Sequence, residues 1–292
     1  MLKRFIVAIL AGACAGMCAA EVKQVLCWGD SVTEGMAMPR DKAYPAQLQK
    51  LLGPGYRVLN GGDGGEDTVT IMARQGAVSL ATTADIKFPA GVKRIELGSH
   101  EDNGFHTSDG RRIKLTAALG REMPVNPVRI GDGAYSLSFT DFRWNTPTNK
   151  IMYRIWLTRT ANPAAELTIP AGEEVVFAST ARVPKAVCEI YFMGANGGWD
   201  NKIETLIAQY RAMIARRGEQ APYLVILPYW QGFSAKNKDA LKKAFGAHVV
   251  EFPVSAELCY QNRLNVHLNE KGYERLARLL HARGVELGYW GQ

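Results

Sequence analysis

The feature that most constrains the fold is an alternation of apolar runs and amphipathic helical segments at both ends of the chain. Near the start, Val22–Trp28 is an apolar run, Tyr44–Leu52 has helical periodicity, and Tyr56–Asn60 is a second short apolar run. The alternation returns at Lys185 and continues to a last helical segment at about 270–283. Strands that are apolar almost throughout are typical of a parallel sheet covered by helices on both faces. We therefore predict an α/β fold with three layers.

Between about residues 80 and 184 the pattern changes to short β-rich runs. Examples are VKRIELG, YSLSFTDF and IMYRIWLT, in which apolar and polar residues mostly alternate and which clusters of Gly, Pro, Asn or Asp separate. No helical periodicity of comparable length occurs in this segment. The sequence therefore predicts one α/β domain built from residues 21–79 and 185–292, interrupted by an inserted antiparallel β subdomain at 80–184.

The first twenty residues have the three-part pattern of an export signal. Lys3 and Arg4 form a basic start, Phe5–Ala13 is apolar but too short to span a bilayer, and Cys18–Ala20 offers small residues for cleavage. No later segment is long and apolar enough to cross a membrane. We therefore expect a cleaved signal peptide at 1–20 and a secreted or periplasmic mature protein.

The distribution of charged residues and the small number of cysteines argue against a nucleic-acid-binding protein and against a metal site. Removal of residues 1–20 lowers the formal net charge from +7 to +5, and the remaining Lys and Arg residues are spread along the chain, so no basic stripe for a nucleic acid forms. Cys27, Cys188 and Cys259 allow at most one disulfide, or stay buried as free thiols.

The polar stretch at 98–110 holds two histidines without a metal-ligand spacing and is expected to be an exposed loop. We expect no metal and no organic cofactor; the number of subunits stays open.

Four turns at predicted strand ends carry groups suited to acyl transfer. The first strand leads into Ser31, the second into a turn with Gly65, the strand after the insertion into Asn196, and the last into a loop with His267. The carboxyl ends of parallel strands meet at one edge of the sheet, where such sheets bind ligands. A serine hydroxyl needs a base such as histidine, and the oxyanion that forms needs N–H donors. We therefore predict Ser31 as nucleophile, His267 as base, and Ser31 N–H, Gly65 N–H and the Asn196 side chain as oxyanion donors.

Around these four residues the sequence resembles the SGNH hydrolases of the GDSL esterase and lipase superfamily. The matching blocks are WGDSVTEG around Ser31, NGGDGG up to Gly65, GANG around Asn196 and HLNEKGY from His267, and they occur in the order that the family has them. The resemblance covers most of both α/β segments and leaves the insertion unmatched. It implies a flavodoxin-like sheet, hydrolysis of an ester, and a site that needs no cofactor.

Two positions depart from the family's pattern. The triad acid usually lies three residues before the histidine, where this chain has Leu264, and Gly197 replaces the Asp that usually follows the block's Asn. Three interpretations stay open: a Ser–His dyad whose His267 is oriented by a backbone carbonyl, an acid recruited from elsewhere such as Glu257, or a chain that has lost activity. We favour the first two, because in Ser-His-Asp enzymes the acid contributes less than the serine or the histidine.

Aromatic residues after the later strands bear on the substrate. Trp199, Tyr229 and Trp230 are predicted to line the pocket mouth, where an aromatic face suits a sugar ring or an acyl chain; packing in the core is the alternative. Together with the predicted export, the β insertion and the resemblance to the SGNH hydrolases, they favour an esterase that removes acetyl-type esters from a carbohydrate. A lipid or aryl esterase of the same superfamily, and a non-catalytic glycan-binding protein on the same scaffold, remain alternatives. We expect a small-molecule or glycan ester as the partner.

Overall fold

The computed structural model describes residues 21–116, 120–145, 150–160, 163–218, 220–260 and 267–291. The predicted signal peptide at 1–20 lies outside these residues. Within the described ranges, none of the helices has both the length and the apolar character needed for a membrane span.

A five-stranded parallel sheet forms the centre of the α/β part. Its strands are β1 (Lys23–Gly29), β2 (Tyr56–Gly62), β12 (Ala186–Phe192), β13 (Tyr223–Ile226) and β14 (Val249–Val250). Their spatial order is β2-β1-β12-β13-β14, and every pairing is parallel. Numbered along this sheet, the order is the 2-1-3-4-5 of flavodoxin-like folds, so the predicted fold class is confirmed.

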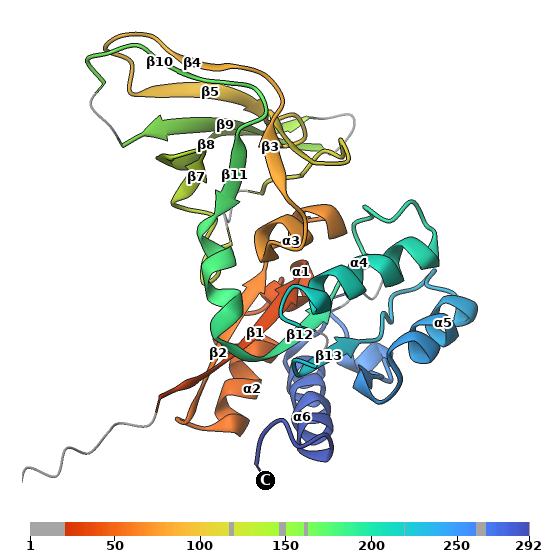
Figure 1. Ribbon diagram of the computed structural model, residues 1–292. Helices are drawn as coiled ribbons and strands as arrows, with labels where there is room; N and C mark the ends of the chain where they lie inside the picture. The colour runs from red at the N-terminus through yellow and green to blue at the C-terminus, as the bar shows by residue number, and fades with distance from the viewer. Residues whose placement is uncertain are drawn as a thin grey trace, which may run out of the picture.

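Helices cover both faces of this sheet (Figure 1). The two on one face are α2 (Tyr44–Leu52) and α6 (Glu270–Glu286). The three on the other face are α3 (Thr68–Gln75), α4 (Ile203–Ala215) and α5 (Ala235–Phe245).

Alternate residues of β1 belong to the two cores on either side of the sheet. Val25 and Cys27 pack with the α2 and α6 side, whereas Leu26 and Trp28 pack with the α3, α4 and α5 side. Burial on both faces explains why this strand is apolar almost throughout. Cys27, Cys188 and Cys259 are buried in the first of these cores, and none of the three is in a disulfide. Burial raises the pKa of the Cys27 and Cys188 thiols, which keeps them protonated and unreactive.

The inserted segment folds into antiparallel sheets of its own, at the top of Figure 1. A seven-stranded sheet has the order β5-β9-β8-β7-β11-β3-β6, and β10 pairs with β4. The strands are β3 (Leu80–Thr82), β4 (Ile86–Phe88), β5 (Arg94–Ser99), β6 (Phe105–Thr107), β7 (Val128–Ile130), β8 (Gly133–Asn145), β9 (Lys150–Arg159), β10 (Leu167–Ile169) and β11 (Glu174–Phe177). The 3-10 helix η2 (Ala178–Lys185) leads from β11 to β12.

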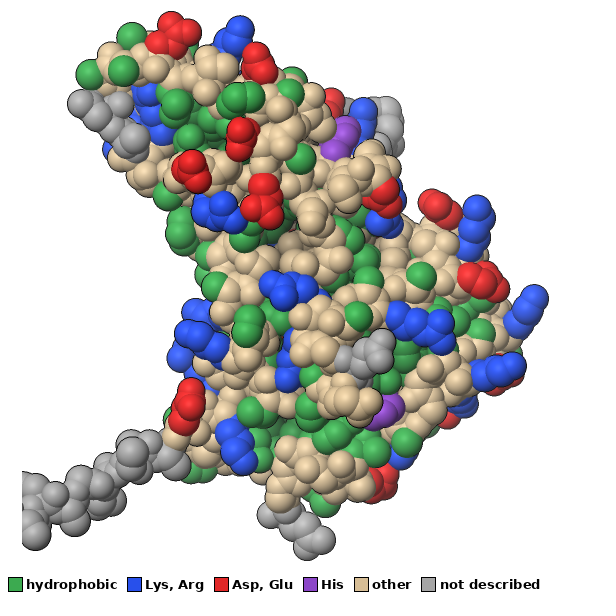
Figure 2. Space-filling model, in the orientation of Figure 1, with side chains coloured by type: hydrophobic (Ala, Val, Ile, Leu, Met, Phe, Trp, Pro, Cys, Tyr) green, Lys and Arg blue, Asp and Glu red, His purple; other side chains and the backbone are tan. Residues whose placement is uncertain are grey.

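Helix α3 packs against both parts of the molecule. Its Ile71 and Met72 belong to the core beside the parallel sheet, while Val69 and Ala73 belong to the separate core of the insertion. The helix follows β2 directly, so the insertion rests on an element adjoining the predicted Gly65 turn. On the face shown in Figure 2, acidic and basic side chains are interspersed over both parts.

The stretch at 98–110 is only in part the exposed loop that its polarity predicts: Glu101, Asp102 and residues 108–110 are exposed, whereas Phe105–Thr107 forms the strand β6. His100 is only 6% exposed, and its ring packs edge-on against Tyr153 at 5.4 Å between centroids. Asn103 is buried with it, and its Nδ2 donates to the carbonyls of His100 and Ile113 at 3.1 Å each, which ties the stretch to the segment that follows it. Within the described residues, no group of three or more His, Cys, Asp or Glu side chains is arranged to hold a metal ion.

Candidate active site

Ser31 and His267 lie within hydrogen-bond distance, although 236 positions separate them in the sequence. The distance from His267 Nε2 to Ser31 Oγ is 2.9 Å. Ser31 begins the short helix α1 (Ser31–Glu34) at the carboxyl end of β1, and 6% of its surface is exposed. A histidine nitrogen at this distance is placed to take the hydroxyl proton.

The residues before Ser31 explain why the chain turns there. Gly29 has no room for a side chain, because a Cβ would lie 2.1 Å from Thr33 Oγ1 and 2.6 Å from Phe192 O. Asp30 caps α1, accepting the backbone N–H of Val32 at 3.1 Å. Asp30 is fully buried, and that burial raises its pKa to about 7. Gly29 and Asp30 therefore shape the turn that presents Ser31.

The backbone of His267 is fixed by pairing with the segment that precedes its loop. Cys259 and Leu268 form an isolated antiparallel bridge, and the N–H of Tyr260 donates to His267 O at 2.9 Å. The N–H of Asn269 donates to Leu258 O at 3.0 Å. Leu268 is completely buried, so the residue next to His267 anchors the turn in the core.

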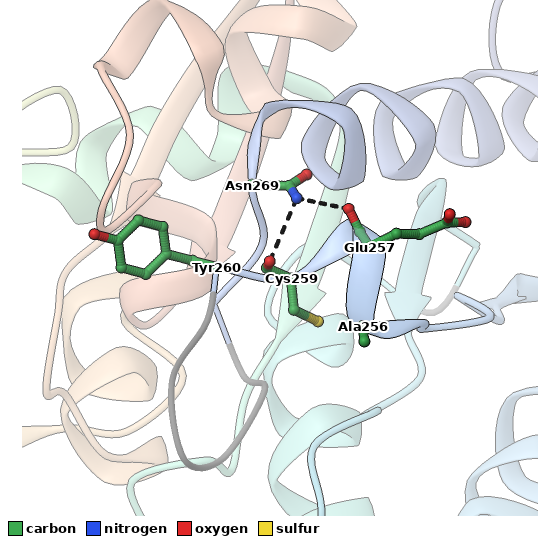
Figure 3. A pocket seen from close by; sticks show the side chains of 5 residues that line it. All are labelled: Ala256, Glu257, Cys259, Tyr260 and Asn269. Carbon is green, nitrogen blue, oxygen red and sulfur yellow. Dashed lines mark hydrogen bonds between the residues drawn. The ribbon is translucent and has the colours of Figure 1, made fainter.

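Asn269 strengthens this pairing with its side chain. Its Nδ2 donates to Glu257 O at 2.7 Å and to Cys259 O at 3.3 Å (Figure 3), while its Oδ1 caps α6 by accepting Gly272 N at 3.1 Å. The HLN block thus contains the predicted base, His267, and two residues later Asn269, whose hydrogen bonds hold the surrounding backbone in place. The sequence reasoning missed the role of Asn269, whose signal was an Asn at the start of a helical pattern.

We expect Gly272→Ala to lower the free energy of unfolding by about 1–3 kcal/mol, because overpacking costs that much. A Cβ at Gly272 would lie 2.2 Å from Leu258 O, so α6 would have to move away from the segment that pairs with His267. Urea denaturation measures the change. Lys271→Ala, an exposed position on the same turn, should stay within about 0.5 kcal/mol of the wild type. Equal stability of the two variants would contradict the proposed close approach.

The imidazole of His267 is suited to act as a base. It is half-buried, and this burial lowers the pKa of His267 from its usual value, which favours the neutral form. Leu264, at the usual position of the acid, lies outside the described residues. The Glu257 carboxylate accepts from Ser255 Oγ at 3.4 Å, and Figure 3 shows this side chain extending away from Tyr260.

The loop after β2 contains backbone amides that have no acceptor among the described residues, and the amide of Gly65 is one of them. Several amides of this loop already have acceptors: Gly62 N with Asn60 Oδ1 at 2.9 Å, Gly64 N with Glu34 Oε2 at 2.9 Å, and Glu66 N with Asp63 O at 3.3 Å. The N–H of Gly65 has no acceptor among the described residues. Gly65 has φ +86°, a left-handed conformation that favours glycine, and a Cβ there would face open space. Its N–H is therefore available to a ligand.

Asn196 is joined to this same loop from the end of β12. Its Nδ2 donates to Glu66 O at 3.0 Å, and Gly197 O accepts the N–H of Thr68 at 3.2 Å. A side-chain amide carries two hydrogens, and among the described residues the second hydrogen of Asn196 has no acceptor. The structure therefore holds the turn with Asn196 against the loop with Gly65, and each keeps a donor for a ligand.

The three aromatic residues predicted to line the pocket mouth differ in their placement. Trp199 is buried and donates from Nε1 to Gly194 O at 2.9 Å. Tyr229 is also buried, with its ring 5.5 Å from that of Phe192. These contacts favour core packing for Trp199 and Tyr229, whereas Trp230 keeps partial exposure.

A cavity of about 530 Å³ lies beside the segment that pairs with His267 (Figure 3). Its lining residues are Ala256, Glu257, Cys259, Tyr260 and Asn269. Tyr260 is 50% exposed, and its N–H bonds the carbonyl of His267. The sequence reasoning missed Tyr260, because nothing in the spacing of this segment distinguishes it from an ordinary loop tyrosine.

Similarity to known proteins appears at the level of structure. No protein-family model matches the chain, and no curated protein matches it. The solved structure of TesA matches with 13% identity and a TM-score of 0.45, covering 91% of this chain and 99% of that one. A protein described as lipolytic and of the G-D-S-L family, from Desulfitobacterium hafniense, matches with 13% identity and a TM-score of 0.44, covering 89% and 99%. A carbohydrate acetylesterase family member from Sinorhizobium meliloti gives 13% identity and a TM-score of 0.43, covering 91% and 99%.

The chain resembles the SGNH hydrolases. The resemblance lies in its four sequence blocks, in the order of its sheet, and in the site where those blocks meet. The β1 turn contributes Ser31, and the later loops contribute Gly65, Asn196 and His267. The site lies where β1 and β12 adjoin, which is the position at which the strand order of the sheet reverses.

Proposed function

We propose that this protein is a serine esterase that hydrolyses a carboxylic ester, with Ser31 as nucleophile and His267 as base. The observation that carries the proposal is the 2.9 Å distance between His267 Nε2 and Ser31 Oγ. It occurs beside two joined loops in which, among the residues that the structure describes, the Gly65 N–H and one hydrogen of the Asn196 side-chain amide have no acceptor. A nucleophile, a base and convergent donors are the requirements of acyl transfer.

In the proposed reaction, Ser31 Oγ attacks the ester carbonyl while His267 Nε2 takes the hydroxyl proton. The N–H groups of Ser31 and Gly65 and the side chain of Asn196 stabilise the oxyanion. Collapse of this intermediate breaks the bond to the alcohol, which leaves with the proton from His267. Water then attacks the acyl-enzyme by the same route, giving up its proton to His267 and releasing the acid and Ser31.

We further propose that an acylated carbohydrate is the substrate. The cavity of about 530 Å³ beside the His267 turn falls in the size range of small-molecule sites. The half-exposed ring of Tyr260 offers a face for a sugar, and Asn269 and Glu257 add polar groups. This mixed lining supports a sugar over a long acyl chain. The pattern of residues 1–20 supports export of the mature protein to the periplasm or the medium.

Covalent labelling tests the enzyme proposal. The purified protein is treated with a fluorophosphonate probe, and peptide mapping is expected to locate the label on Ser31. A folded protein without label on Ser31 would sink the esterase and favour a glycan-binding protein, which calorimetry with oligosaccharides would then detect. For the substrate, acetylated oligosaccharides and p-nitrophenyl octanoate are compared by kcat/KM. Higher values for the octanoate would instead indicate a lipid esterase.

Asn196→Ala is expected to lower kcat for p-nitrophenyl acetate about 10²- to 10³-fold, the usual effect of losing one oxyanion donor. The variant removes both the donor and the bond to Glu66 O. Steady-state kinetics measure the loss, which should fall on kcat more than on KM. Asn237→Ala, at an asparagine of helix α5 that supplies no group to the proposed reaction, is the matched control and should keep wild-type turnover. Equal kcat values for the two variants would exclude Asn196 as a donor.

A further inference from the structure

The inserted subdomain bonds directly to the loop that carries Gly65, through the side chain of Asp63. Asp63 is 1% exposed. Its Oδ1 accepts the hydroxyl of Thr116, and its Oδ2 accepts the N–H of Gly120 at 2.9 Å. Thr116 and Gly120 both belong to the insertion. Both oxygens of a buried carboxylate in the β2–α3 loop are therefore paired with groups from the other part of the molecule.

The backbone of Asp63 joins the same loop to the strand that presents Ser31. Its N–H donates to Gly29 O at 3.1 Å, two residues before Ser31, and its carbonyl accepts the N–H of Glu66 at 3.3 Å. Glu66 O in turn accepts the side chain of Asn196. Asp63 thus links the insertion, the nucleophile turn and the loop with both predicted oxyanion donors.

Neighbouring residues of the insertion contact the end of β2, just before this loop. Glu122 Oε2 accepts the N–H of Asn60 at 2.7 Å. Met123 is fully buried, and its Cγ lies 3.2 Å from where a Cβ of Gly61 would be. The insertion therefore contacts the end of β2 at Asn60 and Gly61 and the following loop at Asp63, rather than a single point.

Glu34 supports the next residue of the loop. Its Oε2 accepts the N–H of Gly64 at 2.9 Å, and its Oε1 lies 3.9 Å from Arg121 Nη2 of the insertion. The position of a Cβ on Gly64 lies 3.7 Å from Ser31 Cβ, so this part of the loop adjoins the nucleophile. A shift of Asp63 or Gly64 would be transmitted to the adjacent Gly65.

We propose that Asp63 is a positioning residue through which the inserted subdomain holds the Gly65 N–H in place for the oxyanion. This inference rests on the proposed function. The physical reason is that an oxyanion donor acts only when its position is fixed before the reaction. Loss of the Thr116 hydroxyl leaves a buried carboxylate oxygen unpaired, and such a group recovers a partner by moving toward water. The insertion is then a structural part of the active site and not an appended module.

The test compares Thr116→Val with Thr82→Val. Both threonines are buried in the insertion, and both substitutions remove a bonded hydroxyl at nearly constant shape. The Thr82 hydroxyl donates to Pro170 O at 2.8 Å and accepts Glu173 N at 3.1 Å, so its contacts lie within the insertion. Thr82→Val therefore controls for a general loss of stability.

Thr116→Val is expected to lower kcat for p-nitrophenyl acetate at least about tenfold, with KM within about threefold of the wild type. Amide hydrogen exchange of the peptide spanning residues 60–67 should become at least about tenfold faster. Asp63→Asn, which keeps the size of the side chain, should change both quantities in the same direction. Thr82→Val should change neither.

Wild-type kcat in Thr116→Val and Asp63→Asn would overturn the proposal, whatever happens to the exchange rates. The bonds of Asp63 to the insertion would then have no effect on catalysis. An equal loss of kcat in Thr82→Val would overturn it too, because the loss in Thr116→Val would then follow from lower stability in general. If the wild type shows no Ser31-dependent hydrolysis, the proposed function fails by itself. The exchange rates then test separately whether Thr116 holds the loop in place. Unchanged exchange in Thr116→Val would overturn this structural part of the proposal as well.

Discussion

Ser31→Ala should lower kcat for p-nitrophenyl acetate by at least about 10⁴-fold, as loss of the nucleophile does in serine hydrolases. The hydroxyl lies 2.9 Å from His267 Nε2, at the edge of the sheet where the donor loops converge. Alanine removes one oxygen and leaves the buried turn of Gly29 and Asp30 unchanged, so the fold should persist. Steady-state kinetics with circular dichroism on the same samples measure both effects.

Ser234→Ala is the matched control for this loss. Ser234 caps α5, where its Oγ accepts the N–H of Asn237 at 3.2 Å. Its replacement should cost about 1 kcal/mol of stability, as the loss of a helix cap does, and leave kcat unchanged. If Ser31→Ala kept more than about 1% of wild-type turnover, another group would be the nucleophile, because serine hydrolases lose far more activity on this change.

The parallel sheet could be predicted from the sequence because its signals are local. The strand with Val25 and Leu26 is buried on both faces, so its apolar run identifies it without knowledge of its neighbours. The turns that carry Ser31 and Asn196 follow such runs directly. Once parallel strands are predicted, their carboxyl ends must meet at one edge, and the candidate site follows from topology.

The direction of individual side chains could not be predicted in the same way. Trp199, Tyr229 and Trp230 all follow strand ends, but the first two turn into the core and only Trp230 keeps partial exposure. What decides between these outcomes is the neighbouring packing, such as the bond from Trp199 to Gly194 O. Position after a strand is a property of the chain, whereas the orientation of a ring depends on partners distant in sequence.

Hydrogen bonds between polar groups far apart in the sequence could not be predicted either. Asp63 lies in a glycine-rich turn, and nothing near it identifies Thr116, 53 positions later, as its partner. His100 is another example, since it is buried together with Asn103, whose Nδ2 donates to the carbonyls of His100 and Ile113. Composition predicts exposure for such stretches, and the carbonyls that compensate their burial leave no trace in a single sequence.

His267→Ala should also lower kcat by at least about 10⁴-fold, because Ser31 would lack a base. The wild-type pH profile carries further information. The neutral imidazole is the active form, and burial lowers the pKa of His267 below its usual 6.5. Activity should therefore be fully present at pH 7 and be lost as the pH falls through a value below about 6.5. Measuring kcat/KM from pH 4.5 to 8 in steps of about half a unit gives this midpoint, since kcat/KM reports the free enzyme.

The midpoint also separates the two ways of orienting His267. A carboxylate beside the imidazole would favour the charged form and raise the midpoint above about 6.5, as in a recruited-acid arrangement. A neutral backbone acceptor would leave burial dominant and the midpoint low. Glu257→Gln should then keep most of the activity, in agreement with a carboxylate that bonds Ser255. His281→Ala, on α6 beside Trp290, is the control for His267→Ala and should be fully active. A midpoint above 6.5 that falls in Glu257→Gln would reject the dyad and establish Glu257 as the acid.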